Sequence, residues 1–222
     1  MRNRLRLRPT HRVHPWHPHA WQIQSLLLDY PGEDQAGRLS LARRTVPALP
    51  AEVGDPLLRF VERAEEAGTE ALAAAYVATF DHRKRCCPYL TYYAHGDTRK
   101  RGLALVRLKQ TYARAGRRLT DGELPDHLAV VLEFAATDPA TGMRLLTEHR
   151  AGLELLRLAL RDDRAPWADL LDSVSATLPA LAGDEREAVA RLAAEGPPEE
   201  QVGLDPYGPP QYMPAPSAGG PR

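Results

Sequence analysis

The sequence predicts an all-α protein, specifically a single-domain helical bundle. Valine and isoleucine together supply only 12 of the 222 residues, while alanine and leucine dominate, and this balance favours helix over strand. Apolar residues recur at steps of three and four, and no segment alternates convincingly at period two. A chain of this length is sufficient for one domain with a sizeable core.

Start and stop residues delimit the helices of the N-terminal half. A first short helix is predicted to begin at Trp21 and to end at the Tyr30-Pro31-Gly32 turn. Asp55-Pro56 is typical of an N-cap followed by proline at the first helical position, and Gly68 is expected to close that helix. Thr69 is expected to cap the next one. Its inward residues are Leu72, Tyr76, Val77 and Phe80.

Similar signals divide the C-terminal half. Asp97 is expected to cap a long helix that ends at Gly116, and Leu124-Pro125-Asp126, Asp138-Pro139 and Pro166 are each expected to open another. The expected inward residues of these four helices are, in chain order, Leu103, Val106 and Ala113; Leu128, Val131, Leu132 and Ala135; Leu146, Leu153, Leu156 and Leu160; and Trp167, Leu170, Leu171, Val174 and Leu178.

The two ends of the chain differ in composition from its centre. Residues 1–19 form a basic, His-rich leader without the apolar core of a secretory signal, and we expect them to be disordered. Residues 196–222 hold eight prolines and five glycines, and this composition also predicts a disordered tail. The helical domain is therefore expected to span residues 20–195. No apolar run is long enough to cross a membrane, so membrane insertion is not expected.

Charge is balanced overall but separated along the chain. Residues 82–118 carry eleven Lys or Arg and one acid, whereas residues 119–205 carry seven Arg and eighteen acids. Opposite fields of this kind attract charged partners. The two cysteines, Cys86 and Cys87, are adjacent and cannot build a disulfide framework, which indicates a reducing, cytoplasmic setting.

No set of residues builds a catalytic or metal centre, so we expect no enzyme activity and no stably bound cofactor. The leader contains four histidines, His11, His14, His17 and His19, but Pro15 and Pro18 interrupt any helix that would align them as zinc ligands. Cys86-Cys87 lacks the spacing of a redox pair, and core packing in a helix explains it better. His95-Gly96-Asp97 has no accompanying nucleophile and is better explained as a helix end, a turn and a cap.

The basic clusters Arg83-Lys84-Arg85 and Arg99-Lys100-Arg101, with Tyr89, Tyr92 and Tyr93 between them, leave a second function open. A basic helical nucleic-acid-binding protein would use such residues for phosphate contacts and base stacking. The chain contains no recognition-helix, zinc-knuckle or RNP pattern, so a solvated basic face is the preferred interpretation and nucleic acid is not an expected partner. A hydrolase using His95 or His127 would also need a nearby nucleophile.

Two blocks of sequence carry distinctive motifs. The first block contains Tyr76, Phe80 and Asp81, then Tyr89-Leu90-Thr91-Tyr92-Tyr93, His95-Gly96-Asp97-Thr98-Arg99 and Arg101-Gly102. The second contains Leu124-Pro125-Asp126-His127-Leu128 and Leu132-Glu133-Phe134. Together they resemble the NarJ family of nitrate reductase molybdenum-cofactor assembly chaperones, within the TorD-like redox-enzyme maturation proteins. The helix pattern extends the agreement from about Ala20 to Trp167, whereas the leader and the tail have no counterpart.

The resemblance implies an all-helical chaperone rather than an enzyme. Its partner would be the apo form of the catalytic (alpha) subunit of respiratory nitrate reductase, held by its N-terminal segment until the molybdenum cofactor is inserted and before membrane attachment. Molybdenum-cofactor biosynthesis proteins are further possible partners. The residues that the resemblance implies for client binding are Tyr76, Phe80, Asp81, Tyr89, Tyr92, His95, Asp97, Arg99, Arg101, Glu123, Pro125, Asp126 and His127.

Two roles remain open for the acids of the second block. Glu123, Asp126 and Glu133 are expected either to meet basic residues of a client or, for Asp126, to supply a favourable charge in a first helical turn. If Asp126 and His127 bind a client, replacing both with alanine should weaken binding and leave stability nearly unchanged.

Overall fold

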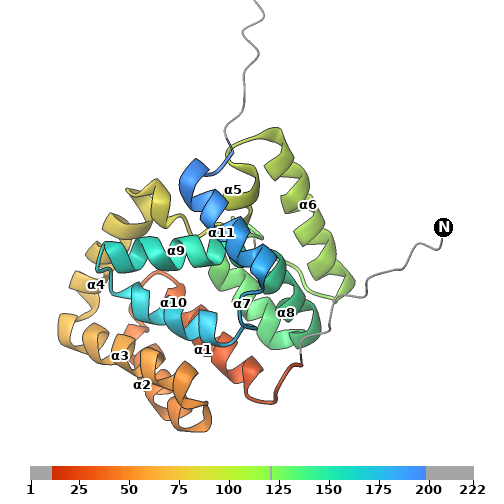
Figure 1. Cartoon of the computed structure of the whole chain (residues 1–222). Coiled ribbons are helices and arrows are strands. Elements are labelled where there is room, and N and C mark those ends of the chain that lie inside the picture. The colour runs from red at the N-terminus through yellow and green to blue at the C-terminus, as the bar shows by residue number, and fades with distance from the viewer. Residues whose placement is uncertain (1–11, 121, 199–222) are drawn as a thin grey trace, which may run out of the picture.

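The first helix, α1 (His17–Leu28), contacts helices from both halves of the chain. This computed structural model describes residues 12–120 and 122–198, which form eleven α-helices (Figure 1). α1 packs against α7 (Leu128–Thr137) and α10 (Trp167–Ala176), which lie far from it in sequence. The all-α prediction is confirmed, since the described residues contain helices and one isolated bridge but no strand.

Three helices of the N-terminal half gather at one side of the molecule: α2 (Gln35–Thr45), α3 (Ala51–Ala67) and α4 (Thr69–Tyr76) (Figure 1). A short 3-10 helix (Val46–Ala48) joins the first two of these, and α4 continues into a π-helical turn (Val77–Asp81). α3 packs across α10, so this group is held to the C-terminal half.

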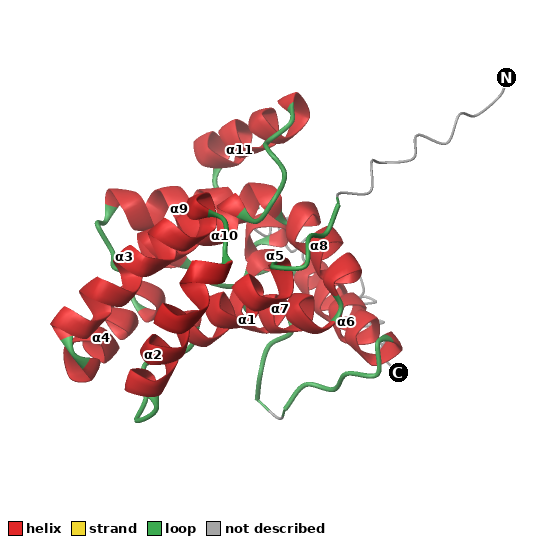
Figure 2. Ribbon diagram, turned by 90° about the horizontal axis from the view of Figure 1, so that it is seen from below, coloured by secondary structure: helices red, strands yellow, loops and turns green. Residues whose placement is uncertain are grey.

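The remaining helices follow the π-helical turn along the chain. After a 3-10 turn (Lys84–Cys86) come α5 (Leu90–His95) and α6 (Arg99–Arg114). α8 (Pro139–Glu148) packs on α7, and α9 (Arg150–Asp162) lies between α10 and α11 (Gly183–Glu195). Figure 2 shows α11 as an outer layer and α6 at the opposite edge from α4.

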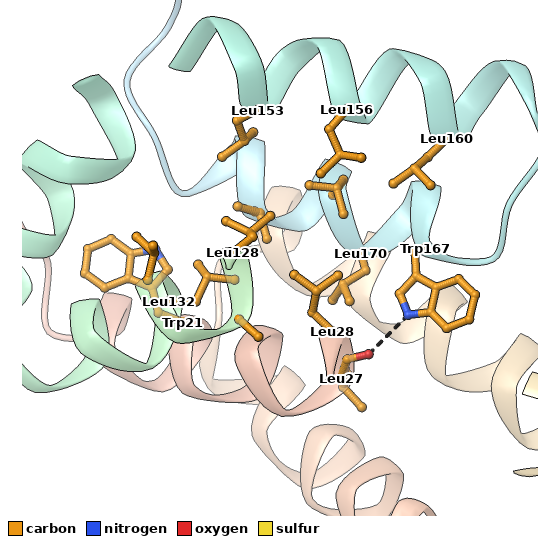
Figure 3. Close-up of a cluster of buried hydrophobic side chains, with 14 of the residues drawn as sticks. Trp21, Leu27, Leu28, Leu128, Leu132, Leu153, Leu156, Leu160, Trp167 and Leu170 are labelled. Atoms are coloured by element: carbon orange, nitrogen blue, oxygen red, sulfur yellow. Dashed lines mark hydrogen bonds between the residues drawn. The ribbon is translucent and has the colours of Figure 1, made fainter. Parts of the chain in front are cut away.

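The core is built where α1, α7, α9 and α10 face each other (Figure 3). Its largest fully buried side chains include Trp21, Trp167 and several leucines. The Trp167 indole Nε1–H donates to the Leu27 carbonyl oxygen across 3.3 Å, which joins α10 to α1. Buried indoles need such a partner, and burying a leucine contributes roughly 1.5–3 kcal/mol. The predicted inward residues of α7, α9 and α10 all lie in this core.

A buried polar seam also ties α1 to α10 and α3. Gln24 Nε2 donates to Ser173 Oγ at 2.8 Å, and that hydroxyl donates in turn to the Val53 carbonyl oxygen at 2.7 Å. Trp21 Nε1 donates to Thr177 Oγ1 at 2.9 Å. Buried polar groups of this kind are costly unless paired, so the seam fixes how the three helices are aligned.

The predicted start of the second helix was wrong. α3 begins at Ala51, after Pro50, and Pro56 lies inside it rather than at its first position. A proline in a helix removes one backbone hydrogen bond. Here the earlier start of the helix places Val53 in the core, where it is fully buried. This burial offsets the loss of the backbone hydrogen bond at Pro56. Gly68 ends the helix as predicted, with a positive φ of 78°.

The inward face predicted for α6 was also wrong. Leu103 and Val106 are 64% and 50% exposed, and Ala113 is exposed as well. Leu108 and Tyr112 face the core instead, and the Tyr112 ring packs on Phe134 of α7 with 4.5 Å between centroids. Both faces of α6 carry apolar residues, so periodicity alone selected the wrong one.

Several helix boundaries differ from the expected ones. α4 follows Gly68 and α6 follows Thr98, so neither Thr69 nor Asp97 is the capping residue. The expected helix after Asp138 is divided at His149 into α8 and α9. α2 was not anticipated. Pro166 does precede α10, and the Asp138 side chain caps α8 by accepting from Thr141 N–H at 3.2 Å.

The helical part of the chain starts earlier than expected. α1 begins at His17 rather than near Ala20, and the His17 ring is buried with Nε2 3.0 Å from the Thr177 carbonyl oxygen. The expected leader therefore does not extend to residue 19. Residues 1–11 and 199–222, where most of the two disordered ends was expected, lie outside the described residues. No helix in the described ranges combines the length and the apolar character that a membrane crossing requires.

Candidate functional site

The two sequence blocks that carry the resemblance meet in space at Tyr89 and His127. These residues form an antiparallel bridge, in which Leu90 N–H donates to the Asp126 carbonyl oxygen and Leu128 N–H donates to the Pro88 carbonyl oxygen, each at 2.9 Å. Their rings pack edge to face with 5.2 Å between centroids. The bridge fixes the segment that leads into α7 against the segment that leads into α5.

Asp126 lies beneath this bridge with none of its surface exposed. Its carboxylate accepts a hydrogen bond from the Thr91 hydroxyl, and Arg101 Nη2 lies 3.5 Å from Oδ2. Arg101 also pairs with Asp97 at 3.1 Å and stands over the Tyr89 ring, 5.5 Å from its centroid. Asp126 Oδ1 has no hydrogen-bond partner among the described residues. Removing one partner of a buried ion pair strongly destabilises the fold, because the other charge is left buried and unpaired.

This position changes the interpretation of Asp126. It lies before α7 rather than in its first turn, and its burial keeps it from direct contact with a client in this conformation. The cap of α7 is His127, whose Nδ1 accepts from Ala129 N–H at 3.3 Å. Burial lowers the pKa of His127, which favours the neutral ring that such a cap requires. Asp126 is thus placed to position the segment, and its burial leads us to expect that replacing it, alone or together with His127, would lower stability.

A cavity of about 290 Å³ opens on the surface between α1, α7 and the loop before α7. Its lining residues come from four parts of the chain: Gln22, Ser25, Leu26 and Asp29; Tyr76; Tyr89; and Gly122, Glu123, Leu124, His127, Ala129, Val130 and Glu133. A second cavity of about 310 Å³ shares Glu123, Val130 and Glu133 with it. We call the two together the α7 groove.

The α7 groove has an acidic part and a partly apolar wall. The described residues that line the first cavity include three carboxylates, those of Asp29, Glu123 and Glu133, and no Lys or Arg, although Arg38 pairs with Asp29 at 3.3 Å. Leu26 and Val130 supply apolar surface beside them. Such a groove suits a peptide segment that combines cationic and apolar side chains. The second cavity ends at Arg117 and Arg118, so the charge changes sign along the groove.

The thirteen residues implied for client binding fall into three sets. Tyr76, Tyr89, Glu123 and His127 line the groove. Arg101, Pro125 and Asp126 form a cluster beside it, where the Pro125 carbonyl oxygen accepts from the Tyr112 hydroxyl at 2.7 Å, and Asp97 pairs with Arg101 at the surface. Phe80, Asp81, Tyr92, His95 and Arg99 do not line it. Of these, Phe80 is a core residue that packs on Trp167.

Sequence reasoning missed the contribution of α1 to the groove. Gln22, Ser25 and Asp29 line it, and the Ser25 hydroxyl donates to the Ala129 carbonyl oxygen at 2.7 Å. The only available signal was an acid, Asp29, directly after the last helical residue. A short helix without a motif gives no other indication of a binding role.

The basic cluster before α5 is partly neutralised within the molecule. Arg83 and Arg85 both pair with Asp163, the first at 2.7 Å. Cys86 is fully buried and burial raises its pKa, so it behaves as a core residue, although it lies in a 3-10 turn rather than in a helix. Cys87 is only half-buried. Among the described residues, no three His, Cys, Asp or Glu side chains are grouped as metal ligands.

Comparison with known proteins identifies the family of the chain. Residues 46–172 match the model of the nitrate reductase delta subunit family. A Bacillus subtilis protein named as a probable nitrate reductase molybdenum cofactor assembly chaperone, NarJ, is 34% identical over 156 residues, which cover 69% of this chain and 85% of that protein.

Two further relatives extend the comparison. The nitrate reductase-like protein NarX of Mycobacterium tuberculosis is 39% identical over 163 residues, 73% of this chain, but the match spans only 24% of the length of NarX. A crystal structure of a putative redox enzyme maturation protein from Archaeoglobus fulgidus shares the fold, with a TM-score of 0.56, 24% identity, and coverage of 77% of this chain and 98% of that one. The chain therefore belongs to the nitrate reductase delta subunit family, as its resemblance to the NarJ group predicted.

Proposed function

We propose that this protein is an assembly chaperone of respiratory nitrate reductase. It binds the apo catalytic subunit in the cytoplasm through that subunit's N-terminal segment. It holds the subunit until the metal clusters and the molybdenum cofactor are in place, and so delays attachment to the membrane anchor. The family match and the name of the Bacillus subtilis relative support this proposal.

The α7 groove is the observation that carries the proposal. A client segment that becomes helical would lay its apolar face on Leu26 and Val130 and bring its basic residues to Glu123 and Glu133. The two glutamates are exposed, and neither forms an ion pair with another described residue, so their charge is available to a partner. Asp126 and Arg101, beside the groove, keep its loop in place and act as positioning residues.

The mechanism is binding rather than bond chemistry. Burial of apolar surface supplies affinity, and the acidic groove supplies selectivity for a basic segment. We propose that the chaperone holds no cofactor of its own and catalyses no turnover. Molybdenum-cofactor biosynthesis proteins would then act on the client while the chaperone retains it.

Calorimetry with a synthetic peptide of the catalytic subunit's N-terminal segment tests the proposal. The parent protein should bind with a negative heat-capacity change, because apolar surface is buried. Glu123→Gln with Glu133→Gln should weaken binding about tenfold, as expected for the loss of two partly exposed ion pairs. Glu62→Gln with Glu66→Gln makes the same change of charge on the exposed face of α3 and should leave affinity unchanged.

Two outcomes would count against different parts of the proposal. Absence of binding to both the peptide and the whole apo-subunit would refute the chaperone function. Binding that is equally strong in the groove variant and in the α3 variant would leave the function standing but would show that the client does not use the acidic groove.

A further inference from the structure

The outward face of α6 carries an apolar ridge. Leu103 and Val106 are among the most exposed large apolar side chains in the described part of the chain, and Ala113 lies on the same face, with the exposed Gln110 between Val106 and Ala113. Their spacing of three and seven residues places them within about 80° of each other around the helix axis. Leu108 and Tyr112, on the opposite face, already hold α6 to the rest of the protein, so the exposed surface of the ridge is not needed for that packing.

Positive charge flanks the ridge on both sides. α6 contains six Lys or Arg residues and no acid. Arg101 turns inward to Asp126, but the other five are exposed: Arg99, Lys100, Arg107, Lys109 and Arg114. None of these five forms an ion pair with another residue in the described ranges. Lys100, Arg107 and Arg114 project on one side of the ridge and Lys109 on the other, as a helix of 3.6 residues per turn requires.

α6 is also placed where a flat surface can reach it. It contacts α5, and both views show it along the outer edge of the molecule (Figures 1 and 2). Leu103, Val106 and Ala113 on its outer face are all exposed. A basic amphipathic helix in such a position has the properties of a helix that lies in the interface of an anionic bilayer.

We propose that the outer face of α6 binds the anionic lipid surface of a membrane. Leu103 and Val106 would enter the headgroup boundary, and the flanking lysines and arginines would meet the lipid phosphates. This is a peripheral contact and not a span. It goes beyond the proposed function, because it assigns a second surface, separate from the acidic α7 groove, and a second kind of partner.

The character of the face favours lipid over other anionic partners. Each Lys or Arg near an anionic surface strengthens binding roughly fivefold, so five exposed cations suffice without a large apolar contact. Two large apolar side chains are too few for a stable protein interface, which buries about 800 Å² per partner. A nucleic-acid surface would place aromatic rings at the apex, where α6 carries Leu103 and Val106 instead. Of its five exposed cations, only Arg99 lies on the line of the ridge, at its N-terminal end.

Sedimentation of the full chain with lipid vesicles tests this proposal. Vesicles of phosphatidylcholine with about a third phosphatidylglycerol should bind the protein, pure phosphatidylcholine should not, and added salt should release it. Leu103→Gln with Val106→Gln should weaken partitioning about tenfold through lost apolar burial. Arg107→Gln, Lys109→Gln and Arg114→Gln together should weaken it about a hundredfold. All five positions are exposed, so thermal melting should change little.

Matched control variants separate α6 from the rest of the chain. Leu41→Gln with Leu158→Gln changes two other exposed leucines, on α2 and α9, and should bind vesicles as the parent does. The N-terminus has its own cluster of arginines. Replacing Arg2, Arg4, Arg6 and Arg8 with glutamine removes more charge than the triple α6 variant and should also leave binding largely intact.

Three results would overturn the proposal. The first is equal sedimentation with anionic and neutral vesicles. The second is loss of binding in the N-terminal arginine variant but not in the α6 variants. The third is an α6-dependent affinity for a single-stranded oligonucleotide in the absence of any preference for anionic vesicles, which would assign the same cations to nucleic acid.

Discussion

Arg101 Nη2 lies 3.5 Å from Asp126 Oδ2, and this pair joins the first turn of α6 to the segment that enters α7. The same arginine has a second carboxylate partner, Asp97, at 3.1 Å. The two partners differ in environment, because Asp97 is 72% exposed and Asp126 is fully buried. Arg101 therefore offers a direct comparison between a buried and an exposed ion pair within one cluster.

Asp126→Ala should lower the free energy of unfolding by about 3 kcal/mol, because it leaves Arg101 and Thr91 without their buried partner. Asp97→Ala removes the exposed partner of the same arginine and should cost less than 1 kcal/mol. Urea unfolding followed by circular dichroism measures both. Equal effects of the two changes would show that burial of the Asp126 carboxylate does not determine the stability of this cluster.

Tyr112→Phe should destabilise the protein by about 1–2 kcal/mol, since the buried Pro125 carbonyl oxygen loses the hydroxyl donor that lies 2.7 Å away. Hydrogen exchange should also speed up at residues 124–128, because this bond ties their segment to α6. Tyr30→Phe removes a hydroxyl from an exposed ring and is the control. Unchanged exchange at residues 124–128 in Tyr112→Phe would contradict the role given to the bond.

Gly142→Ala should destabilise the protein by about 1–3 kcal/mol through overpacking. A Cβ atom at this position would lie 2.3 Å from the Ala135 Cβ, so α7 and α8 would have to move apart. Gly102→Ala, on α6, meets no atom of the described residues within 4 Å and should instead stabilise the helix by about 0.5–1 kcal/mol. Melting temperatures should therefore shift in opposite directions. A rise for both variants would show that the α7–α8 contact relaxes freely.

Acidification should destabilise the protein through buried histidines. In the folded state the pKa of His17 lies below its ordinary value of 6.5, and burial of the ring is the largest cause. As the pH falls through 6.5, the unfolded chain therefore binds the proton first. The stability that the neutral ring contributes is complete above pH 6.5 and is lost as the pH falls toward the folded pKa.

The loss for one histidine is at most about 1.4 kcal/mol per pH unit. Chemical denaturation at a series of pH values should show a shallower decline for His17→Gln than for the parent. His127 and His149 also have lowered pKa values, so some decline should persist in this variant. Identical slopes for parent and variant would contradict the inference for His17.

The fold was predictable where its signals are local. Asp138 caps α8, and Gly68 ends α3 with a positive φ, because both effects depend on a few adjacent residues. The inner face of α6 was not predictable. Leu103 and Leu108 are equally apolar, and only the placement of the surrounding helices decides that Leu108 is buried and Leu103 is exposed.

The candidate site was likewise predictable only in part. The resemblance selected Tyr89 and His127, and the structure brings them together, but sequence could not show that Asp126 lies beneath them rather than at the surface. Burial of a carboxylate depends on a hydroxyl and an arginine supplied by other helices, here Thr91 and Arg101. The α1 wall of the groove was missed for the same reason, because it acquires its role only by packing on α7.

The composition of the α7 groove sets the order of events during protein synthesis. One wall comes from α1, which a ribosome completes first, and the other comes from α7, so the bond that joins Ser25 to Ala129 spans 104 positions of the chain. α1 is further held by Thr177, which is 156 positions from Trp21. A nascent chain that has emerged only as far as α6 therefore has no groove. The groove proposed for the client can therefore form only after α7 and the segment as far as Thr177 have been synthesised.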